Sequence, residues 1–462
     1  ITTEAIAGLE TLDLNRLSTI QIQGLSSAQI SQLLSTQIAA LTTAQIAQLS
    51  SNQISALTPS NISGLSSAQI AALTTANIPG LESEDLAAIT TEAIAGLETL
   101  DLNRLSAIQI QGLSSAQIAQ LSSAQIRALS TANISGLSSA QIAALTTANI
   151  RGLESVDLAL ISTAAIQGLE PDDLALLSSA QWQAITTAQI SQLLSTQIAA
   201  LTTAQIAQLS SNQISALTPS NISGLSSAQI AALTTANIPG LESEDLAAIT
   251  TEAIAGLETL DLNRLSTIQI QGLSSAQISQ LLSTQIAALT TAQIAQLSSN
   301  QISALTPSNI SGLSSAQIAA LTTANIPGLE SEDLAAITTE AIAGLETLDL
   351  NRLSAIQIQG LSSAQIAQLS SAQIRALSTA NISGLSSTQV TALTPSNISG
   401  LSSAQVAALT TVNIAGLESD DLAAITPQAI AGLETLDLNS LSPIQIQGLS
   451  SAQIAQLSSA QI

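Results

Sequence analysis

The chain repeats one pattern of apolar and polar residues with a period of eight, and residues 65–72 (Leu-Ser-Ser-Ala-Gln-Ile-Ala-Ala) show this octad in full. Position one of each octad is Leu or Ile, and position six is Ile, Leu or Val, with Trp182 as the single exception. No insertion or deletion breaks this register between Ile1 and Ile462. Such strict periodicity is typical of a repeat array in which each unit packs only against its neighbours.

Three local structures compete for the octad. A continuous α-helix turns by about 100° per residue, so the apolar positions would drift around the helix and form no stripe. A β-strand would place positions one and six on opposite faces, because side chains alternate along a strand. A single turn of helix followed by a corner brings both positions to the same side. We predict this structure for each octad.

The polar residues support the single helical turn. Position two is mostly Ser, Thr or Glu and position five mostly Gln, Asn or Asp, which is the spacing of an N-terminal capping box. Seven of the 10 prolines occupy position three, which would be the first helical position, where proline is favoured. Every Asp and Glu lies at position two, four or five, and every Arg lies at position seven or eight. The helix dipole favours this distribution of charge.

Glycine provides a further constraint, because all 22 glycines lie at position eight, where they are predicted to end the helix. Many are separated by two octads, as are Gly64, Gly80, Gly96 and Gly112. This spacing predicts that two octads make one coil. We therefore predict an all-α solenoid of one-turn helices. The alternative is a β-solenoid or a leucine-rich-repeat-like solenoid, because residues 97–102 follow the Leu-x-x-Leu-x-Leu pattern.

Longer copies are superimposed on the octad. Residues from Ile249 onward closely repeat those from Ile1, so residues 1–248 form a super-repeat that recurs in part over residues 249–462. The offsets are whole numbers of octads, which indicates that all octad junctions are structurally equivalent. No linker or charge block interrupts the pattern. We predict one continuous solenoid over residues 1–462, and the chain, which begins without Met, is expected to be part of a longer protein.

Composition narrows the possible partners. The formal net charge is −24, from 31 acidic residues and 7 basic ones, so nucleic acid and anionic membrane surfaces are not expected to bind. The mean hydropathy is +0.43, but polar residues recur in every octad. No segment approaches the roughly 18 apolar residues of a membrane helix, and we expect no membrane insertion.

The chain offers little for catalysis. It contains no His, Cys, Lys or Tyr, and these residues supply the usual bases, nucleophiles and soft metal ligands. Ser and Thr are abundant, but they occupy cap positions and have no partner base. We therefore predict no enzymatic activity, no catalytic residues, no small-molecule substrate and no cofactor apart from calcium.

Calcium is considered because the carboxylates cluster and calcium takes carboxylate oxygens as ligands. In a coil of two octads, carboxylates at the same position of alternate octads would stack and repel each other, and a bound cation would relieve this repulsion. The alternative is that these residues are solvated helix caps. The calcium candidates are Glu82, Asp85, Glu98, Asp101, Glu154, Asp157, Glu170 and Asp173.

The octad resembles a known repeat. Residues 41–48 (Leu-Thr-Thr-Ala-Gln-Ile-Ala-Gln) almost match the Leu-Thr-Thr-Ala-Gln-Ile-Ala-Ala octapeptides of very large secreted or surface proteins of Gram-negative bacteria. The resemblance covers the whole chain and implies an exported structural or adhesive role.

The predicted function follows from the repeat and from this resemblance. We predict an extracellular or cell-surface protein whose solenoid forms a filament, stalk or matrix fibre and associates with itself into filaments or bundles. Only seven basic residues are present as sites for trypsin-like proteases, which suits exposure outside the cell. The alternative is the repeat spacer of a bacterial adhesin, stabilised by calcium, that presents a binding domain outside this sequence.

Overall fold

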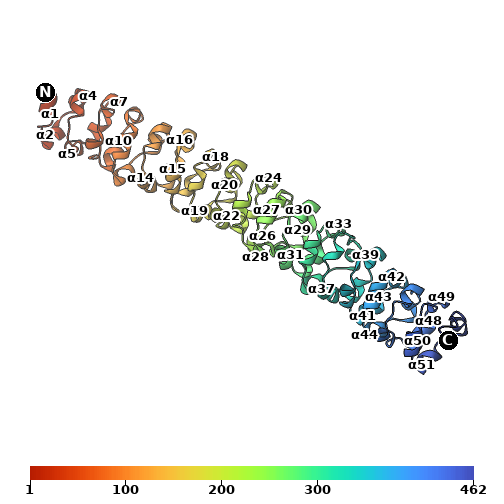
Figure 1. Ribbon diagram of the computed structural model, residues 1–462. Helices are drawn as coiled ribbons and strands as arrows, with labels where there is room; N and C mark the ends of the chain where they lie inside the picture. The colour runs from red at the N-terminus through yellow and green to blue at the C-terminus, as the bar shows by residue number, and fades with distance from the viewer. The chain divides into compact units, whose positions relative to one another are not determined.

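The computed structural model describes all 462 residues as two compact units, Ile1–Leu225 and Ser226–Ile462 (Figure 1). Both units consist of short helices joined by corners. There are 52 α-helices of four to six residues, five 3-10 helices and no strand. The all-α prediction is confirmed, and the β-solenoid alternative is not supported. That residues 1–462 form one continuous solenoid stays a prediction.

The helices follow the octad. Each α-helix begins at position three of its octad and ends at position six, seven or eight. None of the helices is long and apolar enough to span a membrane. The first six helices are α1 (Thr3–Ile6), α2 (Thr11–Arg16), α3 (Thr19–Gln23), α4 (Ser27–Ile30), α5 (Ser35–Ala39) and α6 (Thr43–Ala47). The 3-10 helices occupy positions six to eight and are η1 (Ile78–Gly80), η2 (Ile150–Gly152), η3 (Ile166–Gly168), η4 (Ile238–Gly240) and η5 (Ile326–Gly328).

One coil contains three octads. Helix α1 packs against α4, α2 against α5 and α3 against α6. Helices α1 and α4 begin at Thr3 and Ser27, the same position of octads one and four. Within each unit, the helices therefore form three columns, and each helix packs on the helix three octads away in its own column (Figure 1). The predicted coil of two octads is wrong.

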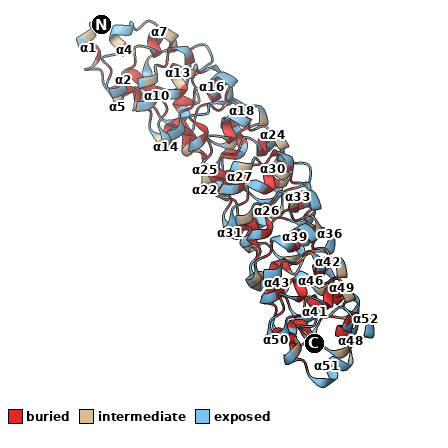
Figure 2. Ribbon diagram, turned by 45° about the vertical axis from the view of Figure 1, so that its right-hand side comes forward, coloured by how far each residue is buried: buried red, intermediate tan, exposed pale blue.

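The interior is formed by positions one and six. Leu65 is 3% exposed and Ile70 is fully buried, and the same two positions line the core through both units (Figure 2). Trp182 takes position six and is 1% exposed, so it replaces an aliphatic core residue. Burying a Leu or Ile side chain contributes about 1.5–3 kcal/mol. Two such residues per octad do not stabilise an isolated turn, so each octad depends on the octads packed around it.

The predicted capping boxes are confirmed where Ser or Thr precedes Gln or Asn, whereas several helices that begin after Glu lack the side-chain cap bond. In α9 (Ser67–Ile70), the backbone N–H of Gln69 donates to the hydroxyl of Ser66, and the side-chain oxygen of Gln69 accepts from the N–H of Ser66. Proline is at the first helical position in α8, α19, α25, α35, α45, α49 and α51, which begin at Pro59, Pro171, Pro219, Pro307, Pro395, Pro427 and Pro443. The N–H groups of the first helical turn have no partner inside the helix. The side-chain caps accept hydrogen bonds from these groups, and proline at the first position has no N–H that needs a partner.

Glycine has a different role from the one predicted. No glycine has a positive φ, so none ends its helix by adopting a left-handed conformation. Instead, position eight of one coil lies against position three of the coil before it. A Cβ atom on Gly64 would overlap the carbonyl oxygen of Ser35 in that preceding coil. Glycine is needed where two coils approach closely, and its spacing of two octads does not report the length of a coil.

We therefore expect Gly64→Ala to destabilise the fold by about 1–3 kcal/mol, as overpacking does in a well-packed core. The control is Gly24→Ala in the first coil, where φ is −76° and the nearest atom to an added Cβ is the Gln21 carbonyl oxygen at 3.4 Å. This change should be neutral or should stabilise the protein by about 0.4–1 kcal/mol. Urea unfolding followed by circular dichroism measures both effects. Equal effects of the two substitutions would contradict the role in close packing.

Candidate functional site

The feature that recurs most often is a buried polar side chain at position five. In most octads this residue is Gln or Asn, and it is almost inaccessible to solvent: Gln117 is 1% exposed and Asn133 is fully buried. A carboxamide buried in this way requires hydrogen-bond partners for both its oxygen and its nitrogen. The hydrogen-bond partners of this oxygen and nitrogen therefore show how neighbouring coils are joined.

Gln117, in α14 (Ser115–Gln120), shows the arrangement. Its side-chain oxygen accepts from the backbone N–H of Ser114 at 2.7 Å, which caps its own helix. Its Nε2 donates to the carbonyl oxygens of Leu86 and Ile89, both at 2.7 Å. These carbonyls flank a corner of the preceding coil, 31 and 28 residues earlier. One side chain thus satisfies backbone groups in two coils.

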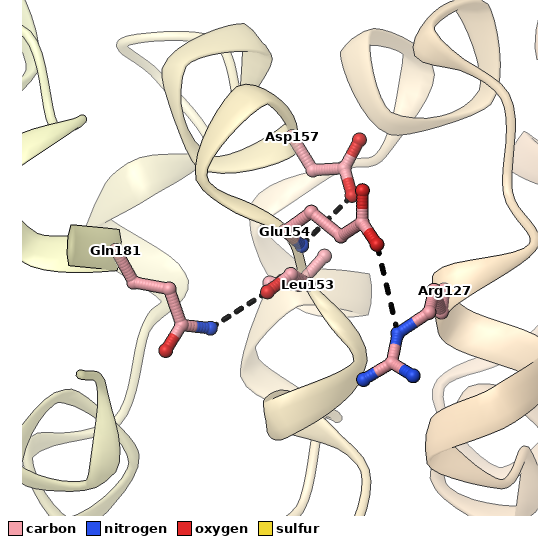
Figure 3. Close-up of polar contacts among 5 residues, drawn as sticks. All are labelled: Arg127, Leu153, Glu154, Asp157 and Gln181. Carbon is pink, nitrogen blue, oxygen red and sulfur yellow. Dashed lines mark hydrogen bonds and ion pairs between the residues drawn. The ribbon is translucent and has the colours of Figure 1, made fainter.

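The same bond recurs along both units. Figure 3 shows the Nε2 of Gln181 donating to the carbonyl oxygen of Leu153 at 2.6 Å, again across 28 residues. The shorter side chain of Asn133 also reaches the preceding coil, since its Nδ2 is 2.7 Å from the carbonyl oxygen of Leu105. We call this series of coil-to-coil bonds from position five the amide ladder.

Exposed side chains add a second, outer set of bonds between coils. The Nε2 of Gln111 donates to the carbonyl oxygen of Gly136 at 3.0 Å. The hydroxyl of Ser115 donates to the carbonyl oxygen of Ala140 at 3.0 Å. An ion pair joins Arg127 and Glu154 at 3.7 Å (Figure 3). Both side chains of this pair are more than half exposed, so it contributes at most about 1 kcal/mol.

In ten octads, the buried residue at position five is Asp. An ionised Asp can accept the capping bond, as Asp157 does from the N–H of Glu154 at 2.9 Å (Figure 3). It has no N–H to donate to the preceding coil, and the Oδ1 of Asp173 is buried without a hydrogen-bond partner. These ten residues are Asp85, Asp101, Asp157, Asp173, Asp245, Asp261, Asp333, Asp349, Asp421 and Asp437.

Burial raises the pKa of all ten aspartates above the ordinary value for Asp. The pKa reaches about 6 for Asp85, Asp173, Asp245 and Asp333. Loss of hydration is the main cause, and neighbouring carboxylates, such as Glu170 and Asp172 beside Asp173, add to it. Both effects disfavour the charged form. A protonated Asp would regain a donor at the place where Gln and Asn have their N–H.

The calcium candidates separate into two kinds of position. Asp85, Asp101, Asp157 and Asp173 are the buried position-five residues just described. Glu82, Glu98, Glu154 and Glu170 are the exposed N-cap residues of the same helices. Alternate octads lie in different columns, so the expected stacking of these carboxylates does not occur. No group of three or more carboxylates is placed to hold a metal ion, and calcium binding stays a prediction.

Open depressions lie between neighbouring coils, and Ser, Thr, Asn and Gln are prominent among the residues that line them. One of these depressions contains Leu34, Ser60 and Asn61. An equivalent depression contains Leu282, Ser308 and Asn309, the matching residues of the super-repeat. These sites follow the repetition of the sequence, and neither combines a nucleophile with a base.

Sequence reasoning identified position five as a cap but missed its bond to the preceding coil. The signal was present, because Glu never occurs at position five although it is common at positions two and four. A cap alone needs only an acceptor, and Glu would provide one. The preference for Gln and Asn over Glu indicates that the side chain also donates in most octads.

A stack of one-turn helices whose successive coils are joined by hydrogen bonds is a helical repeat solenoid. The family model of the ALTTAQ repeat matches most of the chain, and the chain belongs to this family. The matched segments are residues 6–43, 46–83, 94–130, 123–155, 166–203, 198–227, 206–242, 254–291, 283–315, 294–330, 342–379, 363–395, 371–403 and 430–462. The resemblance to Leu-Thr-Thr-Ala-Gln repeats is thereby confirmed. Comparison with curated proteins gives no match.

The amide ladder predicts that Gln117→Glu destabilises the protein, because Glu keeps the acceptor and loses the donor. We expect a cost of about 1–3 kcal/mol from the two carbonyls left without a partner and from the buried charge. Gln120→Glu, on the exposed end of the same helix, is the control and should change stability by less than about 0.5 kcal/mol. Urea unfolding at pH 7 measures both variants. Similar stabilities would show that the donor is dispensable.

The buried aspartates predict that acid stabilises the fold. Because their pKa is higher in the folded state, their contribution is fully present below about pH 4 and is lost as the pH rises through about 6. The free energy of unfolding should therefore increase as the pH falls from about 7 to about 4. Trp182 is the only tryptophan and lies in the core, so its fluorescence reports unfolding at each pH.

A charge-matched pair of variants tests the source of this dependence. Replacing Asp85, Asp173, Asp245 and Asp333 with Asn should flatten the pH profile and stabilise the protein at pH 7 by roughly 1 kcal/mol per site, because Asn restores the donor. The control replaces the exposed Glu4, Glu92, Glu252 and Glu340 with Gln, which removes the same number of charges. The control should keep the slope. A control that flattens the profile equally would assign the effect to net charge.

Proposed function

We propose that this protein is structural and that its repeat solenoid forms part of an extracellular filament, stalk or matrix fibre. The observation that carries this proposal is the amide ladder. Nearly all the buried amides of the chain, such as Gln117 and Asn133, are used to join one coil to the next. The buried amides therefore hold the coils of each column together.

The surface supports the same proposal. Two of its open depressions are lined by matching residues of the super-repeat, whereas an enzyme needs one asymmetric site in which a few polar groups converge. Exposed side chains also bridge neighbouring coils, as Gln111 does to Gly136. Material of this kind resists separation of its coils along each column.

The extracellular location is supported by composition. The chain contains seven basic residues, all of them Arg, and no Cys, so it offers few sites to trypsin-like proteases and needs no oxidative maturation. An acidic surface with a net charge of −24 also keeps such a chain soluble outside the cell.

We expect antibodies raised against the purified chain to label fibres or stalks outside the intact cells that produce it. The measurement is immunogold electron microscopy on unpermeabilised cells, compared with permeabilised cells and with cells in which the coding sequence is deleted. Label that appears only after permeabilisation would contradict the proposed location and function.

A further inference from the structure

Position four of the octad faces solvent, and its usual occupants are small or polar. A module of two octads departs from this rule in five copies by placing Leu at position four of its first octad and Ile at position four of its second. The module occupies residues 9–24, 97–112, 257–272, 345–360 and 433–448. In the second copy, Leu100 is 69% exposed and Ile108 is 70% exposed.

The exposed side chains of the module lie outside the core. Leu100 projects from α12 (Thr99–Arg104) and Ile108 from α13 (Ala107–Gln111), and both helices bury other residues in the core, namely Leu102 and Ile110. All ten exposed Leu and Ile residues of the five modules are 65–77% exposed. Single exposed apolar residues are common in proteins. Leu100 and Ile108 belong to consecutive octads and so lie on different columns. Their recurrence in every copy of one module, at a position where other octads have small or polar residues, indicates apolar contact points on two columns.

The charges on the same helix indicate the partner. The exposed Glu98 is the residue just before α12, and the exposed Arg104 ends the helix, with Leu100 between them in the sequence. Arg104 forms no ion pair within the chain, where the only pair is Arg127–Glu154. Two such helices in antiparallel orientation would bring the Glu end of each helix beside the Arg end of the other, with the exposed Leu of each helix between its two ends. The first four modules carry this Glu–Leu–Arg order, and in the fifth Ser440 replaces Arg.

Most of the arginines of this acidic chain lie at these helices. Four of the seven basic residues are the Arg of the module: Arg16, Arg104, Arg264 and Arg352. Two chains that each carry a net charge of −24 repel each other over most of their surface. The module is where an acid and a base of matched spacing flank an apolar residue, so a second copy of this chain is the partner that complements it.

The spacing of the modules determines the kind of assembly. Within the unit 226–462, the three modules begin at Leu257, Leu345 and Leu433, so successive modules are eleven octads apart. This offset equals three coils of three octads and two further octads. Each module therefore begins two columns on from the previous one, and the three modules together begin on all three columns. Contact sites on different columns would therefore bind different neighbouring chains.

We infer that the five modules are lateral contact sites through which copies of this chain bind one another in antiparallel pairs and, because the sites face different columns, assemble into bundles. A single contact of this size is weak, and several contacts along one chain would act together. The inference rests on the proposed structural function and adds the contact residues and the partner.

The experiment is sedimentation velocity of the purified chain over a range of concentrations. We expect the wild-type protein to form larger species as its concentration rises. A variant with Leu100→Ala and Ile108→Ala and the equivalent Ala substitutions in the other four modules should remain a single chain at concentrations at least ~10-fold higher. Ala is already common at position four. Unchanged unfolding midpoints by Trp182 fluorescence, for the unit 1–225, and by circular dichroism, for the whole chain, will confirm that the variant is folded.

Two further variants test specificity. Leu34→Ser, Leu194→Ser and Leu282→Ser remove exposed leucines outside the modules, which are 50–60% exposed, and should leave association unchanged. Replacing the four module arginines with Gln, which already occupies position eight in other octads, should weaken association. Unchanged association after the arginine substitutions would overturn the choice of a second copy as the partner.

The inference is overturned if the wild-type chain stays single at every concentration or if the alanine variant associates as the wild type does. Immunogold labelling separates this outcome from failure of the proposed function. Labelled extracellular fibres together with single chains in solution would refute the lateral contacts and leave the structural role standing. Label confined to the cell interior would refute the structural role whatever the sedimentation shows.

Discussion

The structure depends on one requirement, which is that a helix of a single turn cannot satisfy its own backbone. Helices of four to six residues have almost no internal hydrogen bonds, so their N–H and C=O groups need partners from elsewhere. The carboxamide at position five meets both needs, since its oxygen caps the helix that carries it and its nitrogen reaches the previous coil. The unit of stability is therefore the contact between two coils. Each octad contributes half of that contact.

Much of the fold could be predicted from the sequence, because local rules determine it. The capping spacing, proline at position three and the sorting of charge all depend on residues within one octad, and each led to the helix start that the structure shows. The length of the coil depends on how octads meet in space. The spacing of the glycines in the sequence did not reveal this length. Gly64 is needed because it lies against the carbonyl of Ser35 in the preceding coil, and no glycine has a positive φ that its own corner would require.

The candidate site could also be predicted only in part: the caps were predicted, and the bonds between coils were not. The Gln, Asn and Asp residues at position five were recognised as caps. The bonds that Gln and Asn make across 28 and 31 residues could not be predicted without knowing the three-octad coil. The expected stacking of Glu82 with Glu98, and of Asp85 with Asp101, depended on the incorrect coil length and disappears with it. Burial gives these aspartates their raised pKa values, which local sequence does not reveal.

The equivalence of the octads also affects how such a protein changes its length. Most octads offer the same cap, the same donor and the same corner carbonyls. Removal or duplication of one octad therefore gives new neighbours only to the few helices beside the junction, and these neighbours present the same kinds of group. Replication slippage or unequal recombination by whole octads would thus yield a foldable product at almost any breakpoint. Such a gene can expand or shrink freely, and the spacing between its exposed contact sites becomes the property on which selection acts.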